Sequence, residues 1–224
     1  MAYSSLLVHF DPGKIGNRVA VILKCPGQDE CESQHPAAGR TGASLKGVFR
    51  LINEMVQNNV DALSQELLPI FNDFCYEPDK PQTGVMVSNA YPMPYYKNGP
   101  NGADVPLDIP CKHVREMADS ISDKRVVICF GIHAARLYNR ICDADCCKKM
   151  ICNQDVIKCC HLSFKCQNIL IKYDVQHRPI LTGESDASER RREVIAKYIF
   201  LRLAGQITSQ ISFGTYLEGL KPKT

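Results

Sequence analysis

Short runs of β-branched and apolar residues are the feature of this chain that most restricts its fold. Three runs are clear and a fourth is a candidate: 18–25 (RVAVILKC), 84–89 (GVMVSN), 125–130 (RVVICF) and 156–162. Runs that are apolar on both faces are typical of strands buried inside a parallel sheet. We therefore expect four strands that lie side by side in the interior of the protein.

Helical patterns separate these strand candidates. Apolar residues recur at three- and four-residue spacing through 45–56, which indicates an amphipathic helix. We expect further helices over 111–122, 132–141 and 188–203, and a weaker one, broken at Pro69, over 61–74. Alternating strands and helices predict the α/β class. The expected architecture has three α/β/α layers around a central, mostly parallel four-stranded sheet.

Two segments carry no periodic pattern. Residues 28–41 form a polar stretch that contains Gly39, and 90–110 contain five prolines and two glycines, so we expect loops in both places. Neither contains a repeat or reads as a linker. A length of 224 residues suits one domain, and we expect residues 1–224 to form it.

The overall composition favours a globular protein of the cytoplasm. Apolar residues make up 45% of the chain and charged residues 23%, and no apolar run approaches the roughly 20 residues that cross a bilayer. The first residues lack the basic and apolar pattern of a secretory signal. We expect a monomer with no membrane partner. The net charge of +3 is too small to demand a nucleic-acid partner and does not oppose one.

Twelve cysteines are unusual in such a chain, and seven of them fall between Cys142 and Cys166. Two pairs are adjacent, which is poor spacing for separate disulfides, so we expect reduced thiols. Zinc bound by Cys142, Cys146, Cys147 and Cys152 is the alternative. The expectation is that the protein holds no metal and no cofactor.

Ligands of parallel α/β sheets bind at the carboxyl ends of the strands. Here these ends carry Pro26-Gly27 with Gly39-Arg40-Thr41-Gly42 after it, Val87-Ser88-Asn89-Ala90, Val127 to Gly131 with His133 beyond, and His161-Leu162-Ser163-Phe164. In this order the four segments resemble the uracil-DNA glycosylase superfamily, in particular its bacterial and archaeal branches. The resemblance spans about residues 18–203, with Leu162 in place of the proline of the family's His-Pro-Ser segment.

The resemblance implies an enzyme that hydrolyses the N-glycosidic bond of a flipped uracil or damaged base in DNA, as in base excision repair. Asn89 would read the base, since its amide offers a donor and an acceptor that match uracil. His161 would stabilise the departing base anion. Gly27 and Ser163 would hold the sugar-phosphate backbone, although Ser163 fits equally well as a helix cap. The partner would be DNA that contains uracil or a damaged base.

Three positions leave the catalytic assignment open. If the first strand and Pro26-Gly27 set the register, Lys24 stands where the family has Glu or Gln, and Cys25 stands at the water-positioning residue. If Gly27-Gln28-Asp29 is matched instead, Asp29 becomes the base that activates water, and it is the best candidate carboxylate. An aromatic residue to stack on the base is missing from 39–42; Tyr91, Tyr95 or Tyr96 would have to replace it.

Two other functions fit the same chain. The substitutions at Lys24 and Cys25 are compatible with a catalytically lapsed nucleic-acid-binding protein on the same scaffold. The cysteines at 142–166 are compatible with a thiol-based sensor or a metal protein. The triplet Arg190-Arg191-Arg192 is either a solvated face balanced by neighbouring carboxylates or a contact for phosphate.

Overall fold

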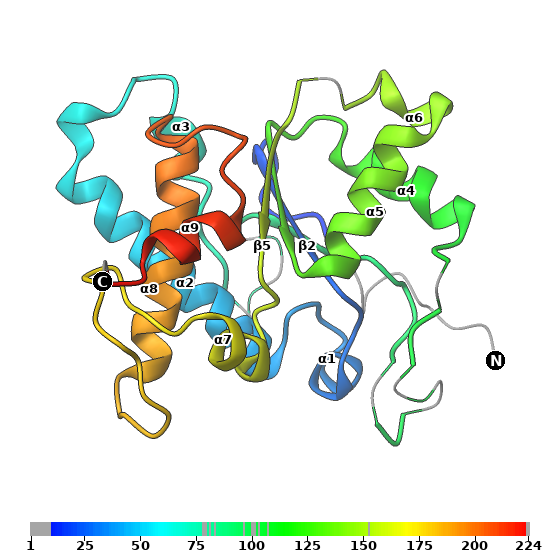
Figure 1. The fold of residues 1–224 in the computed structure, drawn as a ribbon. Helices are drawn as coiled ribbons and strands as arrows, with labels where there is room; N and C mark the ends of the chain where they lie inside the picture. The colour runs from blue at the N-terminus through cyan, green and yellow to red at the C-terminus, as the bar shows by residue number, and fades with distance from the viewer. Residues whose placement is uncertain are drawn as a thin grey trace.

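The computed structural model describes residues 10–222 except 78, 79, 81, 83, 96, 100, 101, 103, 107 and 152, and it contains one five-stranded sheet (Figure 1). The strand order is β1-β3-β2-β4-β5. The bounds are β1 Phe10–Asp11, β2 Val19–Leu23, β3 Met86–Asn89, β4 Val126–Phe130 and β5 Asp155–Cys159. The last four strands pair in parallel, as the apolar runs predict.

The prediction of four strands was wrong by one. The additional strand, β1, pairs antiparallel with β3 at the edge of the sheet, where Phe10 faces Ser88 and Asp11 faces Val87. Two residues are too few to show the alternation or the apolar run by which a strand is recognised in a sequence. The fourth predicted strand, 156–162, is also shorter, because β5 ends at Cys159.

Helices cover both faces of the sheet. One layer contains α2 (Gly39–Asn58), α3 (Leu68–Phe71), α8 (Ala187–Leu203) and α9 (Phe213–Gly219), and the other contains α4 (Cys111–Ile121), α5 (Ile132–Asp143) and α6 (Asp145–Lys148) (Figure 1). Successive strand residues point to opposite layers. Val21 packs with the α2 and α8 side, whereas Ala20 packs with the α4 and α5 side. The three-layer prediction is therefore correct.

Two segments differ from their predicted structure. The weak helix expected over 61–74 is a short 3₁₀ helix, Val60–Ala62, followed by α3 with Pro69 in its first turn. The predicted loop 28–41 contains α1 (Gln28–Ser33) and the beginning of α2. The described residues of 90–110 contain no helix or strand, as expected. Among the described residues, no helix has both the length and the apolar character that a bilayer span needs.

The carboxyl ends of the four parallel strands are aligned across the sheet. Leu23 pairs with Asn89, Ile22 with Cys129, and Phe130 with Cys159. The residues that follow these ends therefore meet at one edge of the sheet, where α1 and α7 (Phe164–Leu170) also lie (Figure 1).

Candidate active site at the carboxyl ends of the strands

A pocket of about 470 Å³ opens beyond the ends of β4 and β5. Its wall includes Lys24, Gly131, His133, His161 and Ser163. The volume lies in the range of small-molecule sites. No Asp or Glu is among the residues described around it, and the N-terminus of α5 adds the positive end of a helix dipole. The pocket thus suits a ligand that carries or develops negative charge.

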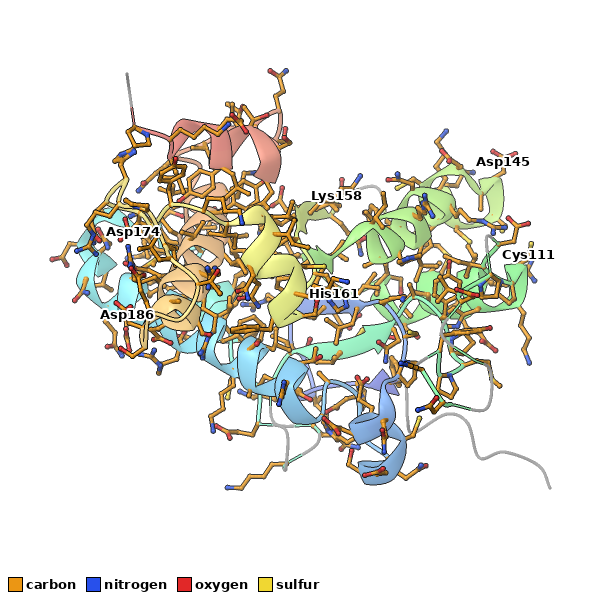
Figure 2. All side chains as sticks on the ribbon, turned by 60° about the horizontal axis from the view of Figure 1, so that its bottom comes forward. Cys111, Asp145, Lys158, His161, Asp174 and Asp186 are labelled. Carbon is orange, nitrogen blue, oxygen red and sulfur yellow. The ribbon has the colours of Figure 1, made fainter. Side chains whose placement is uncertain are left out.

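His161 is held in a single neutral form. Its Nδ1 accepts a hydrogen bond from the backbone N–H of Ser163 at 3.0 Å, so in the neutral ring the proton sits on Nε2. Burial, together with the smaller effects of the nearby Lys24 and His133, lowers the pKa of His161 to about 4. Figure 2 places this side chain near the middle of the molecule, between Asp174 on one side and Cys111 on the other. At neutral pH the ring is a hydrogen-bond donor without charge.

Gly131 allows the close approach of β4 to His161. It caps α5 with a φ of +93°, a conformation that side chains disfavour. A Cβ at this position would lie 3.2 Å from the Cβ of His161. The backbone conformation thus favours glycine here, and a side chain would in addition have to displace His161 by a few tenths of an ångström.

Asn89 ends β3 at the same edge of the sheet, but it does not line the pocket around His161. Strands β2 and β4 separate it from β5, three spacings or about 14 Å across the sheet. Its side chain is fully buried. Neither polar atom of its amide makes a hydrogen bond of ordinary geometry to a described residue, although the amide lies close enough to the Glu30 carboxyl group to lower the pKa of that group. A buried amide oxygen without a partner is costly, and it keeps an acceptor free for a ligand.

Glu30, which the sequence interpretation missed, is the buried carboxyl group beside Asn89. It occupies the third position of α1 and accepts hydrogen bonds from the backbone N–H groups of Gly27 and Ala37. Burial raises the pKa of Glu30 to about 7, although these two bonds and the amide of Asn89 act in the opposite direction. The spacing Gly27-x-x-Glu30 is that of a capping box and was the signal available in the sequence.

We expect Glu30 to make folding pH-dependent. The carboxyl group of Glu30 keeps its proton up to about pH 7 in the folded protein but only up to pH 4.5 in the unfolded chain. The stabilising contribution of the protonated group is therefore complete below pH 4.5 and disappears as the pH rises through 7. That difference corresponds to about 3 kcal/mol in the free energy of unfolding. Glu30→Gln should remove this part of the pH dependence, measured by urea denaturation between pH 4.5 and 8.

Glu32→Gln is the matched control for this experiment. Glu32 is exposed on the same helix, where it accepts a hydrogen bond from Gln28 at 2.8 Å. It should leave the pH dependence of the wild type unchanged. Equal slopes for wild type and Glu30→Gln would show that the Glu30 carboxyl group is ionised in the folded protein at the same pH as in the unfolded chain.

Asp29, the predicted base, lies outside the pocket. It is exposed, and it is not among the residues that line the wall around His161. Its carboxylate lies against the start of α2, since a Cβ on Gly39 would come within 1.8 Å of its Oδ2. The structure therefore does not bring Asp29 together with His161.

The two predicted backbone-binding residues have local roles as well. Gly27 is the N-cap of α1, and its N–H is donated to Glu30, so this N–H is not free for phosphate. Ser163 is the N-cap of α7, and its Oγ accepts from the N–H of Cys166 at 3.4 Å. Ser163 also lines the pocket, so it can serve as cap and as contact.

The candidate stacking tyrosines are not arranged around His161. Tyr91 is buried, donates to the carbonyl oxygen of Pro106 at 2.9 Å and packs edge-on against His133 with 5.6 Å between ring centroids. Tyr95 packs on Tyr91 and accepts at its carbonyl oxygen from Cys25, 3.8 Å away. Tyr96 lies outside the described residues.

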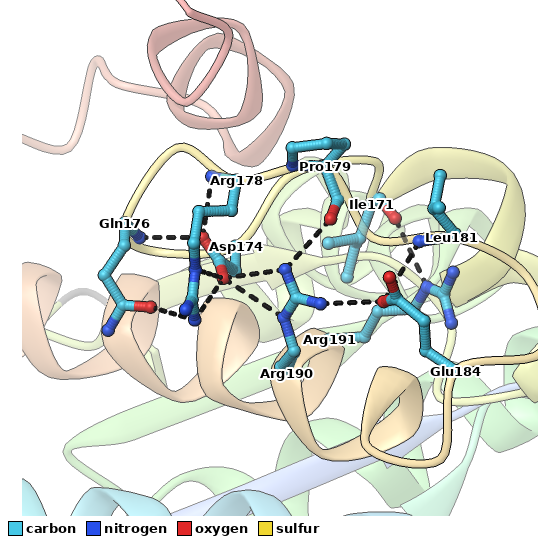
Figure 3. A network of polar contacts seen from close by, with 9 residues as sticks. All are labelled: Ile171, Asp174, Gln176, Arg178, Pro179, Leu181, Glu184, Arg190 and Arg191. Atoms are coloured by element: carbon cyan, nitrogen blue, oxygen red, sulfur yellow. Dashed lines mark hydrogen bonds and ion pairs between the residues drawn. The ribbon is translucent and has the colours of Figure 1, made fainter.

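The expectation of a solvated, charge-balanced face holds for Arg192, which pairs with Glu189 at 3.5 Å, but not for the other two arginines of the triplet. Arg190 binds Asp174 and Glu184, and Arg191 is buried and donates to the carbonyl oxygen of Ile171 at 3.3 Å (Figure 3). Arg192 alone reaches a groove of about 580 Å³ that shares Ser163 with the pocket. The other polar residues that line this groove are basic, hydroxylic or amide: Arg40, Thr41, Ser44, Lys165, Gln167 and Ser188.

The cysteines that the structure describes are free thiols. In the described part of the chain, no three His, Cys, Asp or Glu side chains are grouped so as to hold a metal ion. Cys152, one of the four candidate zinc ligands, lies outside the described residues.

No protein-family model matches the chain, and a comparison with the curated proteins gives no match either.

Proposed function

We propose that the protein is a uracil-DNA glycosylase-like hydrolase that releases a flipped uracil or damaged base from DNA. The observation that carries this proposal is the neutral His161, whose Nε2–H is its remaining donor in a pocket around which no Asp or Glu is described. Cleavage of the bond between base and sugar leaves negative charge on the pyrimidine. A fixed, uncharged N–H donor can stabilise that negative charge through a hydrogen bond, and the imidazole keeps its proton.

The other residues of the pocket support the same chemistry. The ammonium group of Lys24 would attract the departing anion, and the N-terminus of α5 adds to the positive potential. Outside the pocket, the buried amide of Asn89, which lies beside Glu30, would read the base once the base displaces the side chains that cover this residue. The enzyme would pay for extrusion of the base, which costs a few kcal/mol and less in single-stranded DNA.

The basic groove next to the pocket supports DNA as the substrate class. Its lysine and arginines would contact phosphates, and its hydroxyl groups would bond to phosphate oxygens. Ser163 belongs to both the groove and the pocket, so a strand in the groove would pass the mouth of the pocket.

A second candidate is a nucleic-acid-binding protein that does not cleave. Lys24 favours it, because a cation occupies the wall where the family has Glu or Gln, and no carboxylate is described around the pocket to activate water. This protein would bind DNA with an extruded base and release it unchanged.

One experiment separates the two candidates. An oligonucleotide with a single uracil, single-stranded or paired, is incubated with the protein and then with alkali, and a thymine oligonucleotide is the control. We expect cleavage at the uracil position only. Binding in a gel-shift assay without cleavage, also with other damaged bases, would favour the non-enzymatic candidate; neither binding nor cleavage would contradict both.

A further inference from the structure

Two adjacent cysteines on α6 bring their sulfur atoms together. The Sγ atoms of Cys146 and Cys147 lie 3.5 Å apart, and one thiol donates a hydrogen bond to the other. Cys146 is exposed, whereas Cys147 is buried beneath it. The pair therefore offers one sulfur atom to solvent and keeps a second in contact with it.

The surroundings favour the thiolate at Cys146. The hydrogen bond from Cys147 lowers the pKa of Cys146, and Arg115 on α4 adds a hydrogen bond and a positive charge. Burial raises the pKa of Cys147, so the proton of the pair stays on the inner sulfur. An exposed thiolate next to a second thiol is the arrangement of an oxidation-sensitive pair.

We propose that Cys146 and Cys147 form a peroxide-sensitive dithiol, in which Cys146 is oxidised first and Cys147 then closes a disulfide with it. The site lies at the end of the molecule where Asp145 begins α6, away from His161 (Figure 2). It is independent of the proposed glycosylase chemistry.

The two steps balance with a peroxide as the oxidant. The thiolate of Cys146 attacks one oxygen of hydrogen peroxide, the O–O bond breaks, and the hydroxide that leaves takes up a proton to form water. The sulfur of Cys147 then attacks the sulfenic sulfur of Cys146 and displaces hydroxide, which leaves as water with the proton of Cys147. Two thiols are oxidised to one disulfide, and one peroxide is reduced to two waters.

The disulfide would be a reversible one. Adjacent Cα atoms are about 3.8 Å apart, closer than the roughly 4.4–6.8 Å usual for bridged cysteines, and such bonds are readily reduced. The helix that carries the pair is a single turn, so few backbone hydrogen bonds oppose the adjustment.

The chain contains two internal controls. Cys159 and Cys160 are also adjacent, but both are buried and burial raises the pKa of each thiol. Cys111 is exposed and its sulfur lies 3.8 Å from Nη2 of Arg140, but it has no neighbouring cysteine in the sequence. The first control is a pair of adjacent thiols without exposure, and the second is an exposed thiol without an adjacent cysteine.

The test treats the reduced, full-length protein with hydrogen peroxide, unfolds it in denaturant so that all remaining thiols are blocked, and digests it with trypsin. Cleavage after Arg140 and Lys148 gives the peptide 141–148, and cleavage after Lys158 and Lys165 gives the control peptide 159–165. Peptide 141–148 should lose two hydrogen atoms and regain them with dithiothreitol, and it should do so equally in Cys142→Ser. Peptide 159–165 should remain fully blocked.

Cys147→Ala supplies the second readout. Without its partner, Cys146 should stop at the sulfenic acid and form an adduct with dimedone, whereas Cys146→Ser should give neither adduct nor disulfide at this site. The proposal is overturned if the pair at 159–160 oxidises as readily, if the bond in 141–148 requires Cys142, or if Cys146 reacts no faster than Cys111.

Discussion

His161→Leu should slow the release of uracil by about 10²- to 10³-fold in single-turnover measurements, because it removes the donor that we assign to the departing base. Leucine fills much of the space of the ring but offers no N–H. DNA binding, measured with a substrate analogue that is not cleaved, should change far less than the rate. His161→Gln keeps an N–H donor of similar reach and should recover part of the activity.

His133→Leu is the matched control for this prediction. His133 lines the same pocket, but its Nδ1 lies 3.4 Å from the hydroxyl group of Tyr91 and its ring packs against that tyrosine. We expect less than a tenfold effect from it, as for a residue outside the reacting group. Equal losses in the two leucine variants would assign the effect to the shape of the pocket rather than to the donor of His161.

The pH profile tests the protonation state of the same residue. Because burial and the charge of Lys24 hold the pKa of His161 at about 4, the ring stays neutral well below its ordinary value of 6.5. The rate of base release should not change through pH 6.5 on account of this residue, and its protonation should appear only near pH 4. A step near pH 6.5 that His161→Leu abolishes would mean that the imidazolium is the active form.

The main strands could be predicted because their information is local. Residues 19–23 and 126–130 are apolar at every position, and a short, β-branched run of this kind is typical of a strand covered on both faces. Helix α1 could not be recognised in the same way, since its six residues QDECES carry no apolar stripe. It is positioned by one inward carboxyl group, Glu30, and not by hydrophobic periodicity.

The candidate site was predictable in its position and much less in its geometry. The sequence places Asn89 and His161 at strand ends, and parallel pairing puts those ends on one edge of the sheet. It does not reveal that the N–H of Ser163 fixes the tautomer of His161, or that the amide of Asn89 is buried beside Glu30. These features depend on contacts between segments that only the folded chain brings together.

The ion-pair partners of the arginine triplet could not be predicted from the sequence either. Neighbouring carboxylates in the sequence suggested a balanced surface, but the principal partner of Arg190 is Asp174, sixteen residues earlier. Asp174 is fully buried in the loop between α7 and α8 (Figure 3). It accepts hydrogen bonds from the backbone N–H groups of Gln176 and Arg178 and from the side chains of Arg178 and Arg190.

Asp174→Ala should therefore lower the free energy of unfolding by about 3–5 kcal/mol, the usual cost of breaking a buried ion pair by removing one partner. The change leaves Arg190 largely buried without its main counter-ion and leaves two backbone N–H groups unbonded. With a typical total of roughly 5–15 kcal/mol, the loss would be visible as a much lower midpoint in urea denaturation.

Asp186→Ala is the control, because Asp186 is an exposed carboxylate of the same region that makes no side-chain capping bond to α8. It should change the free energy of unfolding by no more than about 0.5 kcal/mol.

The stability in acid gives an independent check of the role of Asp174. Burial would raise the pKa of Asp174, but the bonds from Arg178 and Arg190 outweigh it and hold the pKa below 3.8. The contribution of Asp174 is thus complete above pH 3.8 and lost only as the pH falls through its lowered pKa. The difference between wild type and Asp174→Ala should stay constant from pH 8 to 5 and shrink in stronger acid; a difference that shrinks already near pH 6 would contradict a carboxylate held by these two arginines.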